Sequence, residues 1–458
     1  MREANAWADQ TFGDAALGDL RRTRRLVGMA AGLCARPAGR LTRVYSEGAQ
    51  REGAFRLIEN NAVDPAEIGR ASHRATARRC ASESIVYVAL DSTYLCVVDR
   101  QKAKVGRIGP NSKIHGGMLA MSGLAVDLRG TTLGTTALEY WVRGAERCPR
   151  WEHDDRPAEQ RESSLWKRAL LSTLQVMREQ SPHCVPWFQM DRGADFGDVL
   201  TLAHEMSLLV TVRATHNRAI ESETSHPLLW PQLQAQPVLG YMTVQLPARE
   251  DRPARTARLS LRAKKLRFRV AEVQRKKRRR WVELNAVYVK EVGRRSDGIE
   301  WMLWTTYPVQ DAQDAYQVVL GYTMRWRIED FHRGWKSGGC DIESTQLRSV
   351  SALQRWGAIT AAVAARAEHL KLLSRSEPDC DAELELSRNE IDAAIILTET
   401  KHHRIGDKLT LQQAVWLIAQ VGGYTGKSSG GPPGAQTIAR GLQFVAPAAA
   451  VLAATRSG

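Results

Sequence analysis

The stretch "GYTMRWRIEDFHRGWKS", residues 321–337, contains two tryptophans, two adjacent acids and four arginine or lysine residues. We predict a helix over residues 313–336, in which four side chains share one face within an arc of about 60°. These are Tyr322, Arg325, Glu329 and Lys336. Such a stripe could grip a phosphate backbone and hold a metal ion beside it. The alternative is a solvated charged face with local ion pairs, each worth a few tenths of a kcal/mol.

The composition is that of a globular protein with a polyanionic partner. The 458 residues, 43% of them hydrophobic, are enough for two or three domains, and the formal net charge is +15. Nucleic acid is the usual partner of such a chain, and a membrane surface is the alternative. No apolar run approaches the roughly 20 residues of a spanning helix, so we expect no membrane association. The seven scattered cysteines form no CxxC pair and fit a reducing cytoplasm.

The order of patterns along the chain predicts a mixed architecture. Residues 1–70 form a small basic helical module in which one helix ends at Asn60 and Asn61 and a new one starts at Asp64-Pro65. Strands in sequence with a helix between them, as in "SIVYVALDST" and "CVPWFQMDRGAD", then indicate an α/β core. Residues 220–310 hold short strands and predict a β-rich insertion. A helical tail follows over about 350–458, interrupted by the loop "GKSSGGPPGAQ".

Two acids follow apolar strands. We predict that Asp91 ends the first buried strand and Asp191 a later one, and such strand ends meet in a crevice. Glu329 would add a third oxygen ligand for Mg²⁺ or Mn²⁺ if its helix packs across that crevice. Two such ions can promote phosphoryl transfer, with phosphates held by nearby cations. Alternatively, each aspartate is a helix cap or turn residue. Other acids nearby compete for the same role: Asp99, Asp127, Asp195, Asp198 and Asp330.

The helix at 321–337 resembles the Tyr-(2)-Arg-(3)-Glu-(6)-Lys signature of bacterial DDE transposases of insertion-sequence family four, the transposon Tn-five type. Six further segments agree with the family in order along the chain: "AALGDLRRTRRLV", "EGAFRLIENNAV", "LDST", "MDRGAD", "RPARTARLSLR" and "WMLWTTYPV". The similarity runs from about residue 7 to 348. It implies an α/β fold with a ribonuclease-H-like catalytic core (71–348) and an inserted β-rich subdomain (about 220–310). N-terminal (1–70) and C-terminal (349–458) helical domains would bind DNA ends and mediate dimerisation.

The resemblance also implies cut-and-paste DNA transposition, with cleavage through a hairpin intermediate and one base flipped out of the stack. The implied catalytic and metal-binding triad, holding two Mg²⁺ ions that Mn²⁺ can replace, is Asp91, Asp191 and Glu329. The residues expected to hold DNA phosphates near the cut are Tyr322, Arg325 and Lys336. Trp301 matches the aromatic residue that stacks on the flipped base, and its alternative role is a core aromatic.

End recognition is expected from the N-terminal module, where Arg22, Arg25 and Arg56 match basic contact positions, and Arg213 matches a DNA-contacting strand end. Relatives carry a Lys-Tyr pair where this chain has Ala35-Arg36. The partners implied are double-stranded DNA and a second copy of the chain, each copy cutting the end that the other binds. The expected location is the cytoplasm, at the bacterial nucleoid. Two alternatives are a metal-dependent nuclease of the same fold and a catalytically silent DNA-binding inhibitor.

Overall fold

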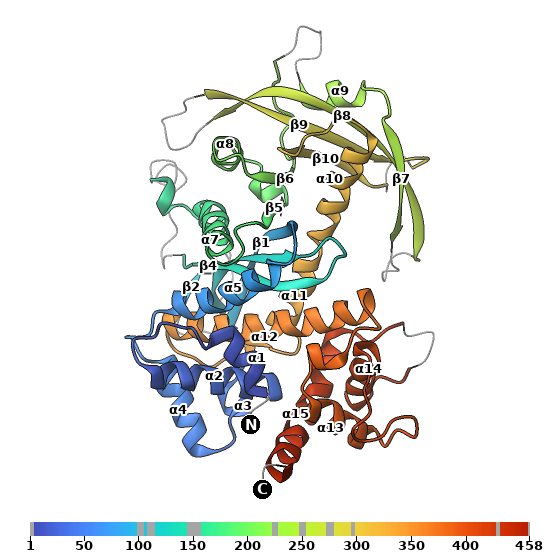
Figure 1. Ribbon diagram of the computed structural model, residues 1–458. Coiled ribbons are helices and arrows are strands. Elements are labelled where there is room, and N and C mark those ends of the chain that lie inside the picture. Colours follow the sequence, from blue (N-terminus) through green and yellow to red (C-terminus); the bar gives the residue numbers. More distant parts are fainter. Residues whose placement is uncertain are drawn as a thin grey trace.

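The computed structural model describes residues 4–98, 105–107, 115–143, 157–221, 228–246, 253–271, 279–294, 298–426 and 431–456. The molecule is elongated, with a twisted sheet running through its upper part and two groups of helices at the other end (Figure 1). The chain begins and ends among those helices. The central region between the β-rich end and the helical end holds the strands that carry the candidate site.

A single sheet of ten strands forms the framework. β1 (Ile85–Val98) lies antiparallel to β3 (His115–Val126), and β3 lies antiparallel to β4 (Thr132–Trp141). On its other side β1 is parallel to β5 (Val185–Met190), which is parallel to β6 (Leu209–Arg213). Three antiparallel strands followed by two parallel ones make the ribonuclease-H-like core that the sequence predicted. The short β2 (Gly106–Arg107) pairs with β3.

The apolar run of β1 is buried on both faces of the sheet. Val86, Val88 and Leu90 belong to the core beneath α7 (Ser164–Gln180) and α8 (Gly197–Glu205). Tyr87 and Ala89 belong to the opposite core, which also contains residues of three later helices, α10 (Ala312–Met324), α11 (Arg327–Lys336) and α12 (Val350–Ser376). Because a strand alternates its side chains, helices on both faces require a continuous apolar sequence, which "IVYVAL" supplies. α5 (Pro65–Cys80) also packs against β4 and α7.

The predicted β-rich insertion is present and extends the same sheet. Its antiparallel strands are β7 (Gly240–Leu246), β8 (Arg255–Ala271), β9 (Arg279–Glu291) and β10 (Glu300–Thr305). β10 also pairs antiparallel with β6, so the insertion is continuous with the sheet of the ribonuclease-H-like core. The short α9 (Leu229–Gln234) contacts β8 and β9. In Figure 1 these strands curve over α10 (Ala312–Met324) at the top of the molecule.

The N-terminal helices are α1 (Ala4–Phe12), α2 (Leu20–Ala35), α3 (Leu41–Val44) and α4 (Gly48–Ile58). The carboxylate of Asp19 caps α2 by accepting the N–H of Arg21 at 2.8 Å. Asp64 caps α5 in the same way, with Pro65 at its first position, so this helix starts where the sequence predicted. The sequence reading did not resolve the short helices α1 and α3.

The C-terminal region is helical, as predicted. α12 (Val350–Ser376) crosses the molecule below the sheet, and α13 (Arg388–Thr398), α14 (Leu411–Val421) and α15 (Ala435–Arg456) pack beside it. Although Arg440 and Gln443 interrupt its apolar residues, α15 is a 22-residue helix that is long enough and apolar enough, by length and composition only, to cross a membrane. This is weak evidence for a membrane, since core helices pass the same test. Part of α15 packs against α13 and α14, with Ile438, Leu442 and Val445 in a shared apolar core.

Candidate active site

The first two acids lie side by side on neighbouring strands. The prediction that Asp91 ends its strand is wrong, because β1 continues to Val98 through its pairing with β3. The parallel pairing of β1 with β5 does end here, at Leu90 opposite Met190. The next residues are Asp91, which is still within β1, and Asp191, which directly follows β5, and adjacent strands lie about 5 Å apart. The candidate site is therefore at the carboxyl end of the parallel ladder.

Arg325 joins Asp91 to Glu329. Its Nη1 lies 2.8 Å from Oδ2 of Asp91, and its Nη2 lies 2.9 Å from Oε1 of Glu329. Only 7% of Arg325 is exposed. The structure thus brings Glu329 beside Asp91, as the sequence expected. It differs in placing the cation between the two carboxylates, where the sequence predicted that it would project beside them.

The predicted helix at 313–336 is two helices, α10 and α11 (Arg327–Lys336). Between them the N–H of Arg325 bonds to the carbonyl of Tyr322, and the N–H of Trp326 bonds to that of Thr323, which makes one tighter turn. Tyr322 and Arg325 lie buried at this junction. Further along α11, the side chain of Glu329 is 44% exposed and that of Lys336 is 25% exposed. The four residues therefore do not form one uniformly solvated stripe.

The electrostatic environment of Asp91 is unfavourable for its charge. Burial raises the pKa of Asp91 to about 6, with a further upward contribution from Asp191, while Arg325 opposes both and Glu329 adds to them. Asp191 also has a structural role, since its Oδ1 accepts the N–H of Gly193 at 2.8 Å and caps the turn Arg192–Ala194. The cap predicted as the alternative for Asp191 is thus real, and it uses one carboxylate oxygen.

These carboxylates have the chemistry of a site for hard divalent cations, which prefer oxygen ligands. Such an ion would offset the repulsion between the negative charges of Asp91 and Asp191. Over the described part of the chain, however, no three acidic, histidine or cysteine side chains are grouped so that they could hold a metal ion as they lie. Arg325 lies between two of the three acids instead. The donor set fits a divalent ion, provided that the guanidinium moves away from the carboxylates.

An aromatic pair adjoins this cluster. Trp301 on β10 meets the ring of Tyr322 edge to face, with centroids 5.3 Å apart. Trp301 is half-buried against the core, so the alternative reading as a packing residue is partly correct. Trp304, its neighbour in sequence, is fully buried and stacks on Phe268 at 4.0 Å. Of the two tryptophans, only Trp301 therefore borders the candidate site.

Arg213 is also close to this aromatic pair. It ends β6 opposite Leu303 of β10, and its Nη2 lies 3.4 Å from the carbonyl oxygen of Glu300. Burial raises the pKa of Tyr322, and the charges of Arg325 and Arg213 act in the opposite direction. Both cations therefore face the phenol. The structure gathers into one region Tyr322, Arg325, Arg213 and Trp301 beside the three acids.

Lys336 has a neighbour that the sequence reading missed. Its Nζ lies 3.6 Å from Oε1 of Glu343, and the same oxygen accepts the N–H of Cys96 of β1 at 2.8 Å. Glu343 lies in the 3-10 turn Ile342–Ser344, which follows α11. No periodic pattern in the sequence marks a turn this short, so the contact could not have been found from spacing.

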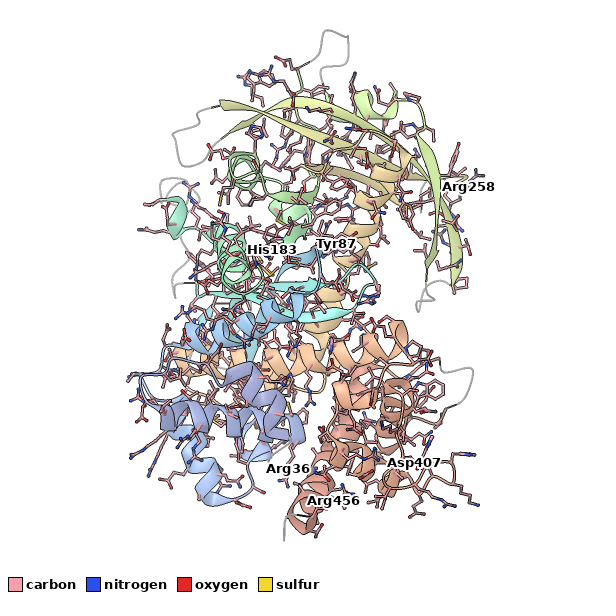
Figure 2. The ribbon with its side chains drawn as sticks, viewed as in Figure 1. Arg36, Tyr87, His183, Arg258, Asp407 and Arg456 are labelled. Carbon is pink, nitrogen blue, oxygen red and sulfur yellow. The ribbon has the colours of Figure 1, made fainter. Side chains whose placement is uncertain are left out.

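The predicted DNA-end residues lie elsewhere, on the N-terminal helices. Arg22 is half-buried and donates to the carbonyl of Leu17 at 2.9 Å, whereas Arg25 is exposed and lies over Gly53 of α4. Arg56 is exposed and pairs with Glu52. Figure 2 labels Arg36 in this helical module and Tyr87 in the sheet, well apart. End recognition and the acid cluster would therefore use different regions of the chain.

Several competing acids have structural partners. Asp127 accepts the N–H groups of Arg129 and Thr131 in the turn between β3 and β4. Asp195 is buried and pairs with Arg218 at 2.7 Å. Asp330 pairs with Arg333 and Lys371, Asp198 lies in the first turn of α8, and Asp99 lies outside the described residues. The basic run 275–280 also lies outside the residues whose side chains the structure describes.

Three family models match the chain in succession. "Transposase DNA-binding" matches residues 4–63, "Transposase DDE domain" matches 162–365, and "Transposase Tn5 dimerisation domain" matches 362–457. The DDE match includes Asp191 and Glu329, and Asp91 lies before it. This ordered set of domains indicates DNA binding, dimer formation and transposase activity of the DDE class. Members of that class generally use divalent metal ions. The chain belongs to the Tn5-type DDE transposases.

Proposed function

We propose that the chain is a cut-and-paste transposase that binds the two ends of a DNA element, cleaves them through a hairpin intermediate and joins them to target DNA. Its catalytic and metal-binding residues would be Asp91, Asp191 and Glu329, holding two Mg²⁺ ions that Mn²⁺ can replace. The observation that carries this proposal is the link through Arg325 from Asp91 to Glu329, with Asp191 directly after the adjacent strand β5. Bound divalent ions would stabilise the attacking and leaving oxygens of a phosphoryl transfer.

The protein groups around the acids would position the DNA strand. With the carboxylates engaged by cations from solution, the guanidinium of Arg325 would be free to bind a phosphate through two parallel hydrogen bonds. Lys336 lies seven residues further along α11, about 10 Å away from Glu329 at 1.5 Å per residue, and would hold a second phosphate. The phenol of Tyr322, facing Arg213 and Arg325, would donate to the same strand.

Trp301 would stack on a base flipped from the hairpin. Its half-exposed ring lies against Tyr322, so it is next to the phosphate-binding groups without being sealed in the core. Stacking on an aromatic ring is worth about 1–3 kcal/mol per base, which offsets part of the unstacking in a strained hairpin. Arg213, on the neighbouring strand, would contact the backbone beside that base.

The helical domains would assemble the complex on two ends. Arg22, Arg25 and Arg56 would contact one DNA end while a second copy of the chain cuts it, in the bacterial cytoplasm. Within the span that matches the dimerisation model, α14 and α15 leave large apolar side chains exposed. They are Trp416, Phe444 and Val451. An apolar surface of this kind suits a partner subunit.

The test is incubation with Mg²⁺ of a plasmid bearing the DNA element of this chain between its flanking sequences. Excised linear fragments with hairpin ends are expected. Nicks without excision would favour the nuclease alternative, and binding without cleavage would favour the inhibitor.

Glu329→Gln should abolish cleavage and leave end binding nearly unchanged. Asp330→Asn is its matched control, because Asp330 is the adjacent acid on α11 and pairs away from the site with Arg333 and Lys371. Full cleavage by Glu329→Gln, or equal losses in both variants, would remove Glu329 from the proposed triad.

A further inference from the structure

Glu343 is a carboxylate placed next to a cation that is proposed to bind DNA, which is unusual because it would repel the phosphate. Its Oε1 lies 3.6 Å from Nζ of Lys336. A separation of 3.6 Å is an ion pair but is too long for a hydrogen bond. Lys336 is thus attracted toward Glu343 while this contact consumes none of its three N–H donors.

The position of Glu343 is fixed from the catalytic strand. Oε1 accepts the N–H of Cys96 at 2.8 Å, and Cys96 lies five residues beyond Asp91 on β1. A hydrogen bond from a backbone N–H to a carboxylate is charge-assisted and short. Glu343 therefore holds the ammonium of Lys336 at a defined place along the strand that carries the first acid.

The turn that carries Glu343 is also fixed from the N-terminal module. Nε of Arg40 donates to the carbonyl of Ser344 at 3.1 Å. Gly39 packs so closely that a Cβ on it would lie 1.8 Å from the carbonyl oxygen of Asp341. Asp341 itself has a left-handed backbone, with φ of 43°. Aspartate tolerates this conformation better than most residues other than glycine, so the turn is fixed by the Arg40 hydrogen bond and the close packing of Gly39.

We propose that Glu343 is a positioning residue that orients Lys336 along β1 for contact with a phosphate of the cleaved strand. The inference rests on the proposed phosphate role of Lys336. The competing possibility is that Glu343 masks Lys336 and weakens its contact with DNA. The two differ in sign: a positioning residue makes the contribution of Lys336 to DNA binding larger, and a masking residue makes it smaller.

A double-mutant cycle measures this sign. The probe is a labelled duplex containing one end of the DNA element of this chain, bound by the full-length protein in Ca²⁺ without Mg²⁺, so that the carboxylates have a hard divalent ion, and a denaturing gel checks that the duplex stays uncut. Glu343→Gln retains an oxygen that can accept the N–H of Cys96 and removes the charge. We expect Lys336→Ala to weaken binding about tenfold in the wild-type background and about twofold in the Glu343→Gln background. In the wild-type background it should also reduce the steepness of the salt dependence, measured as the slope of log K against log salt concentration, by about 1.

The matched control is Glu139→Gln. Glu139 pairs with Arg168 on β4 and α7, and its side chain is 20% exposed, close to the 24% of Glu343. In that background Lys336→Ala should keep its full tenfold effect. Thermal melting of every variant checks that the fold is retained.

The remaining outcomes separate the two proposals. An equal loss in the wild-type and Glu343→Gln backgrounds, or a larger loss in Glu343→Gln, overturns the positioning role and leaves the phosphate role of Lys336 intact. If Lys336→Ala changes neither affinity nor salt slope in any background, the phosphate role fails, and the inference about Glu343 fails with it.

Discussion

Asp91→Asn should make the metal-free protein more stable while it abolishes cleavage. The side chain of Asp91 is only 19% exposed, so solvent screens its charge weakly. Burial and the neighbouring Asp191 raise its pKa to about 6, even though Arg325 donates to it. An amide at this position carries no charge, and its oxygen can still accept the hydrogen bond from Arg325.

The magnitude follows from the shift between the ordinary and the folded-state pKa. From 3.8 to about 6 is roughly 2 units, or about 3 kcal/mol at 1.36 kcal/mol per unit. Because the folded-state pKa is the higher one, the protonated carboxyl is favoured in the folded protein. Its stabilising effect is complete below about pH 4 and is lost as the pH rises through about 6. Asp91→Asn should therefore be stabilising by about 2–3 kcal/mol at pH 8 and nearly neutral at pH 4.

Thermal melting in EDTA between pH 4 and pH 8 tests this prediction. The melting temperature of Asp91→Asn should exceed that of the wild type by an amount that grows with pH. Mg²⁺ should raise the wild-type value at pH 8 and change the variant much less, because a ligand stabilises only a protein that binds it. Asp330→Asn is the control and should show no such pH dependence. A variant less stable than wild type at pH 8, or a difference that does not depend on pH, would refute this account of the site.

One further prediction concerns the N-terminal module and another concerns a buried histidine of α5. Arg22→Ala combined with Arg25→Ala should weaken end binding and flatten its salt dependence, because two cations that contact phosphate are lost; an unchanged salt slope in an anisotropy titration would argue against phosphate contact. Burial lowers the pKa of His73 to about 3, and the charges of Arg70 and Arg74 add to this effect. Below about pH 6.5 the unfolded chain therefore binds a proton at His73 that the folded protein does not bind, so the free energy of unfolding falls as the pH drops. His73→Leu should thus be more stabilising at pH 4 than at pH 8, by roughly 3 kcal/mol, and equal melting shifts at both values would contradict it.

The fold was predictable because its strongest signals are local and periodic. The continuous apolar run of β1 indicated a strand covered on both faces, and Asp64-Pro65 marked the start of α5. The extent of β1 was not predictable. Asp91 interrupts the apolar pattern, so the strand seemed to end there, yet its pairing with β3 continues to Val98 opposite His115. The polar residues lie mid-strand because the parallel partner β5 stops at Met190 and leaves that edge open to the site.

The sequence indicated which residues belong to the candidate site better than it indicated which of their side chains contact each other. Spacing along one helix indicates which side chains share a face, but it carries no information about what lies opposite. Asp91, the partner of Arg325, is 234 residues away in sequence. The break between α10 and α11 also places Arg325 in a tighter turn, where its guanidinium enters the core. A buried cation facing two acids was therefore visible only once β1 and α11 were placed together.

The positive charge of the chain is divided between two kinds of arginine, and this division has a functional consequence. Arg25 and Arg56, in the helical module, are exposed, so any DNA phosphate can reach them. Arg325 is buried and both of its Nη atoms donate to Asp91 and Glu329, so those two groups are available to DNA only after the carboxylates take another partner. Non-specific DNA in the absence of divalent ions would then engage the module without assembling the site. We expect an exchange of partners at Arg325, from carboxylate to phosphate, to be the step that makes cleavage depend on metal and DNA together.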